Sequence, residues 1–187
     1  GSIRDGRSGA AVGAWVAENA AQRADAEFEV IDLKSFDVPL LTSATVPAAA
    51  KKQYESENVQ RWSTAIDACD GFVFVTPEYN HGVPGVFKNA IDWLSRPAAE
   101  IPKVFGNRPV AIMGATPGGF GTTLGQAHWL PVLHALGTRT WFGGRLLVSG
   151  AHHVFNENGE LVDEVVRKQL RDFLHGFSQF VQMEQGG

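Results

Sequence analysis

Short runs of apolar residues alternate along this chain with longer segments in which apolar residues recur every three or four positions. An uninterrupted apolar run bounded by glycine or proline is typical of a strand that is buried on both faces, as in a parallel sheet. GFVFVTP (71–77) is such a run and predicts a strand. FEVIDL (28–33) is interpreted as a short buried strand, PVAIMGAT (109–116) as another, and TRTWFGGRLLVSG (138–150) as a last strand that is broken at a glycine pair.

The segments between these runs have the spacing of amphipathic helices. They predict a helix that begins at Ser8 or Gly9, helices over about 48–68, 86–94 and 122–136, and a last helix whose apolar stripe extends from Val162 to Val181. Asp163 and Glu164 fall in the first turn of that last helix, where the helix dipole favours negative charge. Since strand and helix alternate, the pattern predicts an α/β domain in three layers with a parallel sheet.

Composition narrows the class of protein. With 187 residues, 44% of them hydrophobic, the chain is expected to form a single domain over 1–187. A net charge of -4 argues against a nucleic-acid partner, and no apolar run is long enough to cross a membrane. The only cysteine, Cys69, excludes an internal disulfide and a cysteine-based metal site, so we expect no metal and a cytoplasmic location.

The opening GSIRDGRSG has the composition of a phosphate-binding loop. Backbone N–H groups in a glycine-rich turn and at the start of a helix bind anions, and Ser2 and Arg4 add side-chain donors. The alternative is an ordinary surface turn. The stretch matches neither the Walker P-loop nor GxGxxG, which argues against a nucleoside triphosphate and against a dinucleotide held in the usual Rossmann manner.

Two further polar loops follow predicted strands. TPEYNHGVPG (76–85) offers Tyr79 to a planar ring, and TPGGFGT (116–122) has glycines that allow a ligand close to the backbone. Taken singly, each is also compatible with a surface turn. Because ligands of open α/β sheets bind beyond the carboxyl ends of the strands, we expect all three loops to meet at one edge of the sheet.

With these loops in view, the chain resembles the NAD(P)H-dependent FMN reductase family of flavodoxin-like proteins. GSIRDGRSG resembles the family's GSxR phosphate motif, PEYNHGVPGVFKNAIDWLS (77–95) is very close to its flavin-ring segment, and TPGGFGT resembles its third flavin loop. The resemblance continues in order through GRLLVSGAHHVFNENGELVDE (144–164), so it covers essentially the whole chain.

The resemblance implies a flavodoxin-like fold with strand order 2-1-3-4-5, non-covalently bound FMN and a dimer that completes the flavin pocket. The residues implied to hold FMN are Ser2 and Arg4 at the phosphate with Arg7 and Ser8 assisting, Pro77, Glu78, Tyr79 and Asn80 along the isoalloxazine, and Thr116, Gly118 and Gly119 at the other edge of the ring. The helix that contains Asn89, Asp92 and Trp93 is implied to pack against the partner subunit.

The family has an apolar strand directly before GSxR, whereas this chain begins at that motif. We therefore expect the first strand, which is central in the order 2-1-3-4-5, to be missing from this chain. A Gly-Ser cloning scar would also account for residues 1–2, and Ser2 would then lose the role that the resemblance implies for it.

The resemblance implies an oxidoreductase in which hydride passes from NADPH or NADH to N5 of FMN and on to a quinone, flavin, azo compound or metal oxyanion, with ping-pong kinetics. Since the cofactor carries the chemistry, no side chain is predicted to be catalytic. We expect a small-molecule acceptor and a homodimer or dimer of dimers. The alternatives are a flavodoxin-like electron carrier, which a net charge of only -4 disfavours, and a redox-responsive flavin-binding partner protein.

Overall fold

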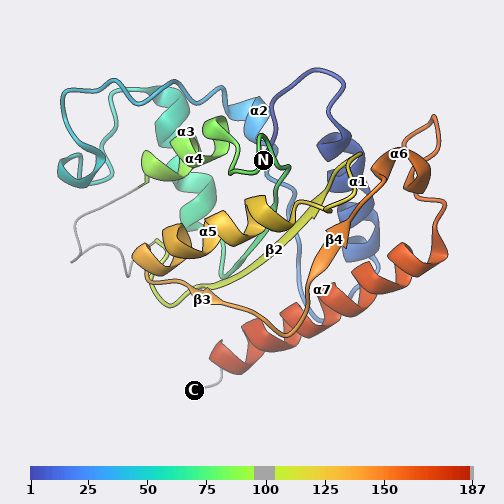
Figure 1. Ribbon diagram of the computed structural model, residues 1–187. Coiled ribbons are helices and arrows are strands. Elements are labelled where there is room, and N and C mark those ends of the chain that lie inside the picture. Colours follow the sequence, from blue (N-terminus) through green and yellow to red (C-terminus); the bar gives the residue numbers. More distant parts are fainter. Residues whose placement is uncertain (95–103, 186–187) are drawn as a thin grey trace.

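A computed structural model describes residues 1–94 and 104–185 (Figure 1). Its elements in chain order are α1 (Ser8–Ala21), α2 (Leu33–Phe36), the 3-10 helix η1 (Pro47–Ala49), α3 (Glu57–Asp67), β1 (Phe72–Val75), α4 (Gly85–Asp92), β2 (Pro109–Ala115), α5 (Thr123–Ala135), β3 (Arg139–Thr140), β4 (Leu146–Val148), α6 (Ala151–Val154) and α7 (Glu164–Gln185). No helix within the described ranges is long and apolar enough to span a membrane.

The sheet is parallel throughout and is centred on β2. One side of β2 pairs with β1, with Val110 opposite Phe72. The other side pairs first with β3 and then, after the break at the glycine pair, with β4. The predicted parallel sheet is confirmed, and the order β1-β2-β3/β4 corresponds to strands 3, 4 and 5 of the expected order.

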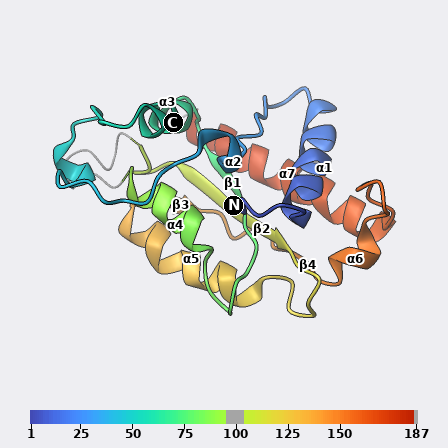
Figure 2. The same ribbon diagram turned by 90° about the horizontal axis from the view of Figure 1, so that it is seen from above.

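Helices cover both faces of this sheet, so the predicted three layers are present (Figure 2). Alternate residues of β2 enter two separate cores. Val110 and Ile112 pack with side chains of α3, α4 and α5, whereas Ala111 and Met113 pack with side chains of α1 and α7. This two-sided burial is the reason that the strand has an uninterrupted apolar sequence.

The strand predicted over 28–33 is absent, because residues 28–32 carry no sheet pairing and Leu33 begins α2. In the expected order 2-1-3-4-5, segment 28–33 is the second strand, and β1 of this structure is the third. The first strand of that order would lie between them and pair with both. Among the described residues nothing lies in that position, so 28–33 has no ladder to join. A β-pattern predicts a strand only where a partner backbone can accept and donate its hydrogen bonds.

The edge of β1 that faces away from β2 is unpaired within the described part of the chain. It borders a cavity of about 720 Å³. Both helical layers line this cavity, with Val16 of α1 and Val181 of α7 on one side and Ile66 of α3 and Phe87 of α4 on the other. The cavity also reaches Ser2, so it ends at the opening loop.

Two predicted helix boundaries are wrong. The helix expected over 48–68 begins at Glu57, because the Ser56 side chain accepts a hydrogen bond from the Val59 N–H (3.4 Å) and caps it. Ahead of that cap, Lys51 and Lys52 have positive φ angles that interrupt a helix.

The last helix also starts later than the apolar stripe suggests. Asp163 lies just before α7, and its carboxylate accepts hydrogen bonds from the Val165 and Val166 N–H groups (2.9 and 3.0 Å). Val162 and Val165 are exposed rather than part of the core. An aspartate at this position ends the preceding turn and satisfies N–H groups that have no partner within the helix.

Candidate functional site

The three polar loops come together at one edge of the sheet. Because β1 and β2 are parallel neighbours, the segments that follow them, 76–84 and 116–122, leave the sheet at the same edge. The opening loop joins them through Ser2, whose Oγ lies 2.6 Å from the Tyr79 hydroxyl. The predicted convergence is therefore present in the structure.

The opening loop is tied to α2 and to the residue before it by two ion pairs. Asp5 pairs with Lys34, and this hydrogen bond lowers the pKa of the Asp5 carboxyl. The Arg7 guanidinium lies 2.6 Å from Asp32, which also caps α2 through the Lys34 N–H. Arg4 is exposed and has no ion pair with any described residue. Of the two arginines expected at the phosphate, Arg4 is thus the one that is available to an anion.

The start of α1 completes this anion-binding region. The helix begins at Ser8, as predicted, and no described side chain caps its first N–H groups. A Cβ built at Gly6 or Gly9 would meet no described atom within 4 Å, so the backbone there borders open space. Uncapped N–H groups at the positive end of a helix dipole, beside a serine and an arginine, suit a phosphate.

The second loop contains a tight turn from Tyr79 to Gly82. The two residues exchange backbone hydrogen bonds of 3.2 and 3.0 Å. Between them, Asn80 and His81 both have positive φ angles, 50° and 63°, as a two-residue type I′ turn requires. The turn orients the Tyr79 ring toward the opening loop and leaves Asn80 exposed.

Glu78 has a contact that sequence reasoning missed. Its Oε2 accepts a hydrogen bond from the Gly125 N–H (2.8 Å) in the first turn of α5, and Oε1 lies 3.4 Å from Nδ1 of His81. The Thr122 side chain at the N-cap makes no capping hydrogen bond, so Glu78 supplies the missing acceptor from another loop. Glu78 therefore connects the second loop to the helix that follows the third.

The third loop is held by the segment after β4. The Thr116 carbonyl accepts from the Ala151 N–H (3.0 Å), and the Gly118 carbonyl accepts from the Gly150 N–H (3.2 Å). Thr116 Oγ1 in turn accepts from the Gly118 N–H (3.3 Å). A Cβ on Gly119 would meet nothing within 4 Å, so the apex of the loop borders open space.

Thr122 and Gly114 form a close contact beneath the third loop that the sequence did not reveal. Thr122 is fully buried at a φ of 70°, which is unfavourable for a β-branched residue. A Cβ on Gly114 would overlap both Thr122 Oγ1 and the Thr76 carbonyl oxygen. A glycine inside a predicted buried strand is the signal that could have pointed to this close approach.

Asn89 and Trp93 hold a loop of the same chain. The Asn89 amide and the Trp93 indole both donate to the Pro39 carbonyl (2.9 and 2.8 Å), and Asn89 Oδ1 accepts from the Leu41 N–H (2.9 Å). Asp92 pairs with Lys88 on the same helix (2.7 Å). The side chains that were expected to face a partner subunit are thus engaged within the protein, and the loop that they hold presents Leu40 to solvent.

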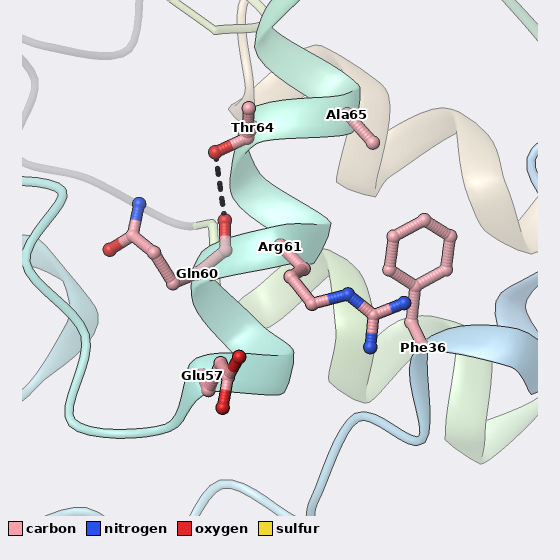
Figure 3. A pocket seen from close by; sticks show the side chains of 6 residues that line it. All are labelled: Phe36, Glu57, Gln60, Arg61, Thr64 and Ala65. Atoms are coloured by element: carbon pink, nitrogen blue, oxygen red, sulfur yellow. Dashed lines mark hydrogen bonds between the residues drawn. The ribbon is translucent and has the colours of Figure 1, made fainter.

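A second hollow lies away from the three loops, on the outer side of α3 beside α2 (Figure 3). The Arg61 guanidinium lies over the Phe36 ring, 5.5 Å from its centroid, and Thr64 donates to the Gln60 carbonyl (3.0 Å). The Arg61 guanidinium and the Thr64 hydroxyl are thus both engaged by neighbouring residues. No residue of the three loops lines this hollow, so it is separate from the candidate site.

Several known proteins are similar to this chain. The NADPH-dependent FMN reductase family matches residues 1–153. An NAD(P)H-dependent FMN reductase of Pseudomonas aeruginosa is 36% identical over 128 residues, which is 68% of each chain. A quinone reductase of Escherichia coli K12 is 31% identical over 189 residues, covering 97% of this chain and 92% of the relative. The structure of a flavoenzyme NAD(P)H:(acceptor) oxidoreductase from Paracoccus denitrificans superposes with a TM-score of 0.80 at 26% identity, covering 98% of this chain and 94% of that one.

The parallel sheet, its two helical layers and the loops at its carboxyl edge define a flavodoxin-like, FMN-dependent oxidoreductase. The uncapped start of α1, the exposed Arg4 and the open space at Gly9 fit the phosphate end of FMN. This chain belongs to the NADPH-dependent FMN reductase family, and FMN with NAD(P)H as co-substrate is its cofactor set.

Proposed function

We propose that this enzyme transfers two electrons from NAD(P)H, through FMN, to a quinone-type small molecule, and that donor and acceptor use the same site in turn. The observation that supports this proposal is the convergence of the three loops, joined by the contact between Ser2 and Tyr79. The P. aeruginosa relative is named an FMN reductase and the E. coli relative a quinone reductase, and these names suggest the two classes of acceptor to test first.

Each loop has a proposed task in holding the cofactor. Ser2 and Arg4 donate to the phosphate, Arg7 assists, and Ser8 contributes the first backbone N–H groups of α1. The segment from Pro77 to Asn80 borders the isoalloxazine, with the Tyr79 turn setting its direction. Thr116, Gly118 and Gly119 border the other edge of the ring, where the absence of side chains on the glycines allows a close approach.

When bound, FMN supplies the hydride chemistry, so the reaction NAD(P)H + H⁺ + quinone → NAD(P)⁺ + hydroquinone needs no nucleophilic side chain. The protein binds FMN and orients the donor and the acceptor against it. Backbone N–H groups of the second and third loops stabilise negative charge at one edge of the ring, because donors fixed in advance cost no reorganisation during the reaction. Donor and acceptor that use the same site in turn would give ping-pong kinetics.

We also propose that the protein acts as a homodimer or a dimer of dimers. The loop held by Asn89 and Trp93 presents Leu40 and Val46 with exposed fractions of 71% and 59%. Contact with a second copy would bury these side chains. The mass in solution, measured by light scattering, tests this part of the proposal, and a monomer at all concentrations would contradict it.

The first test is an absorbance spectrum of the purified protein, followed by NADPH or NADH without oxygen. The proposal predicts flavin bands that bleach, and sustained NAD(P)H consumption once a quinone is added. Initial rates at several fixed quinone concentrations should give parallel double-reciprocal plots. Bands that do not bleach would instead favour an electron carrier or a redox-responsive binding protein, and a protein that takes up no added FMN would contradict the site.

A further inference from the structure

The hydrogen bond between Ser2 and Tyr79 joins the predicted phosphate end of the site to the predicted ring end. Ser2 is 5% exposed, and its Oγ lies 2.6 Å from the Tyr79 hydroxyl. The same Oγ accepts a long hydrogen bond, 3.4 Å, from the Arg4 N–H. A tyrosine from the ring-binding turn thus contacts the serine of the phosphate-binding loop.

The donors and acceptors around Ser2 determine which hydroxyl donates in the hydrogen bond between Ser2 and Tyr79. A serine hydroxyl has one proton and two lone pairs, and the Arg4 N–H occupies one of the lone pairs. In the free protein either hydroxyl can donate to the other. A phosphate oxygen accepts but does not donate, so a phosphate bound by Ser2 accepts a hydrogen bond from the Ser2 hydroxyl. Since Ser2 has no second proton, the Tyr79 hydroxyl then donates to the remaining lone pair of Ser2.

We infer that Tyr79 is a positioning residue for the phosphate of FMN, acting through Ser2. In this relay, the Tyr79 hydroxyl donates to Ser2 Oγ and Ser2 donates to a phosphate oxygen. The relay fixes the Ser2 proton toward the anion and strengthens the serine as a donor, because hydrogen bonds in a chain polarise one another. This role is additional to any contact between the Tyr79 ring and the flavin, and it rests on the proposed function.

The chain contains a matched control for this inference. Its other tyrosine, Tyr54, lies against Trp93 with ring centroids 6.3 Å apart, and the Tyr54 hydroxyl is buried without a hydrogen-bond partner among the described residues. Tyr54→Phe and Tyr79→Phe therefore remove the same atom from two settings. The first setting contains no hydrogen bond to the opening loop, and the second does.

The experiment measures dissociation constants of FMN and riboflavin for the flavin-free full chain, by quenching of flavin fluorescence. The two ligands share the ring system and differ by the phosphate. Tyr79→Phe keeps the aromatic ring, and we expect it to weaken FMN binding by about five- to tenfold and riboflavin binding by no more than about twofold. We expect Tyr54→Phe to change either constant by no more than about twofold.

The Ser2→Ala variant tests whether the effect passes through the serine. We expect Tyr79→Phe to cause no further loss of FMN affinity in that background, because coupled residues are non-additive. Circular dichroism and thermal melting of each variant show that the fold is kept. If Tyr79→Phe weakens both flavins equally, leaves both unchanged or tightens FMN, the inference is wrong while the proposed function stands. If the unaltered protein binds neither flavin, both are wrong.

Discussion

The two strands β1 and β2 have similar apolar sequences but different surroundings. β2 is paired on both sides, and six of its seven residues are buried, which places both of its faces in the core. β1 is paired to β2 alone within the described residues, and its burial alternates between buried phenylalanines and half-buried valines. The valines Val73 and Val75 lie along the cavity of about 720 Å³.

This difference shows that an apolar run specifies a potential strand, while its neighbours decide how well it is packed. Segment 28–33 lines the same cavity and remains unpaired, although its sequence also predicts a strand. The candidate site borders both the well-packed pair of strands and the cavity. The second and third loops leave the packed pair of strands, whereas the opening loop lies at the end of the cavity.

The largest losses of stability are expected from substitutions in β2, and the first of these lies beneath the third loop. In Gly114→Ala the new methyl group would overlap Thr122 and the Thr76 carbonyl, and the backbone there cannot move away without opening the sheet. We expect a loss of unfolding free energy on the order of 3 kcal/mol, typical of overpacking in a close-packed core. Urea unfolding followed by circular dichroism measures this loss.

Gly119→Ala is the matched control for that substitution, because a Cβ at Gly119 meets no described atom within 4 Å. We expect its unfolding free energy to stay within about 0.5 kcal/mol of the unaltered protein. Equal losses at both positions would show that the third loop is packed at its apex, contrary to the structure.

The second substitution compares the packed strand with the rim of the cavity directly. Met113 of β2 is fully buried, and Met113→Ala should cost about 2–5 kcal/mol of unfolding free energy. Val30 lines the cavity and is 49% exposed, so Val30→Ala should cost less than about 0.5 kcal/mol. A loss at Val30 as large as that at Met113 would mean that the segment over 28–33 is as firmly packed as β2.

Apart from the control substitutions, the smallest effect is expected where the second loop meets α5. Glu78→Ala removes the acceptor for the Gly125 N–H, and we expect a loss of about 0.5–2 kcal/mol, as for other lost helix caps. Glu78→Gln keeps an acceptor oxygen, so its loss should be smaller. Thermal unfolding of the two variants measures the difference. If the glutamine variant is the less stable of the two, the carboxylate stabilises the protein by its charge and not as a cap.

Part of the site could be predicted from sequence because its chemistry is local. The glycines and polar residues that follow apolar runs indicated loops at the carboxyl ends of strands, and parallel pairing then brings two of those loops to one edge. The contacts of Glu78 with Gly125 and of Arg7 with Asp32 could not be predicted in this way. Each joins residues far apart in the chain, and no spacing rule connects them.

The sequence by itself determined the parallel α/β architecture, a first helix that begins at Ser8 or Gly9, and the composition of the three loops, because periodicity and turn preferences act over a few residues. The tertiary structure alone decided that 28–33 forms no strand, that Thr122 adopts a left-handed conformation above Gly114, and that Ser2 meets Tyr79. These three outcomes depend on which backbone or side chain lies next to each residue in the folded protein. That arrangement follows from packing across the whole domain.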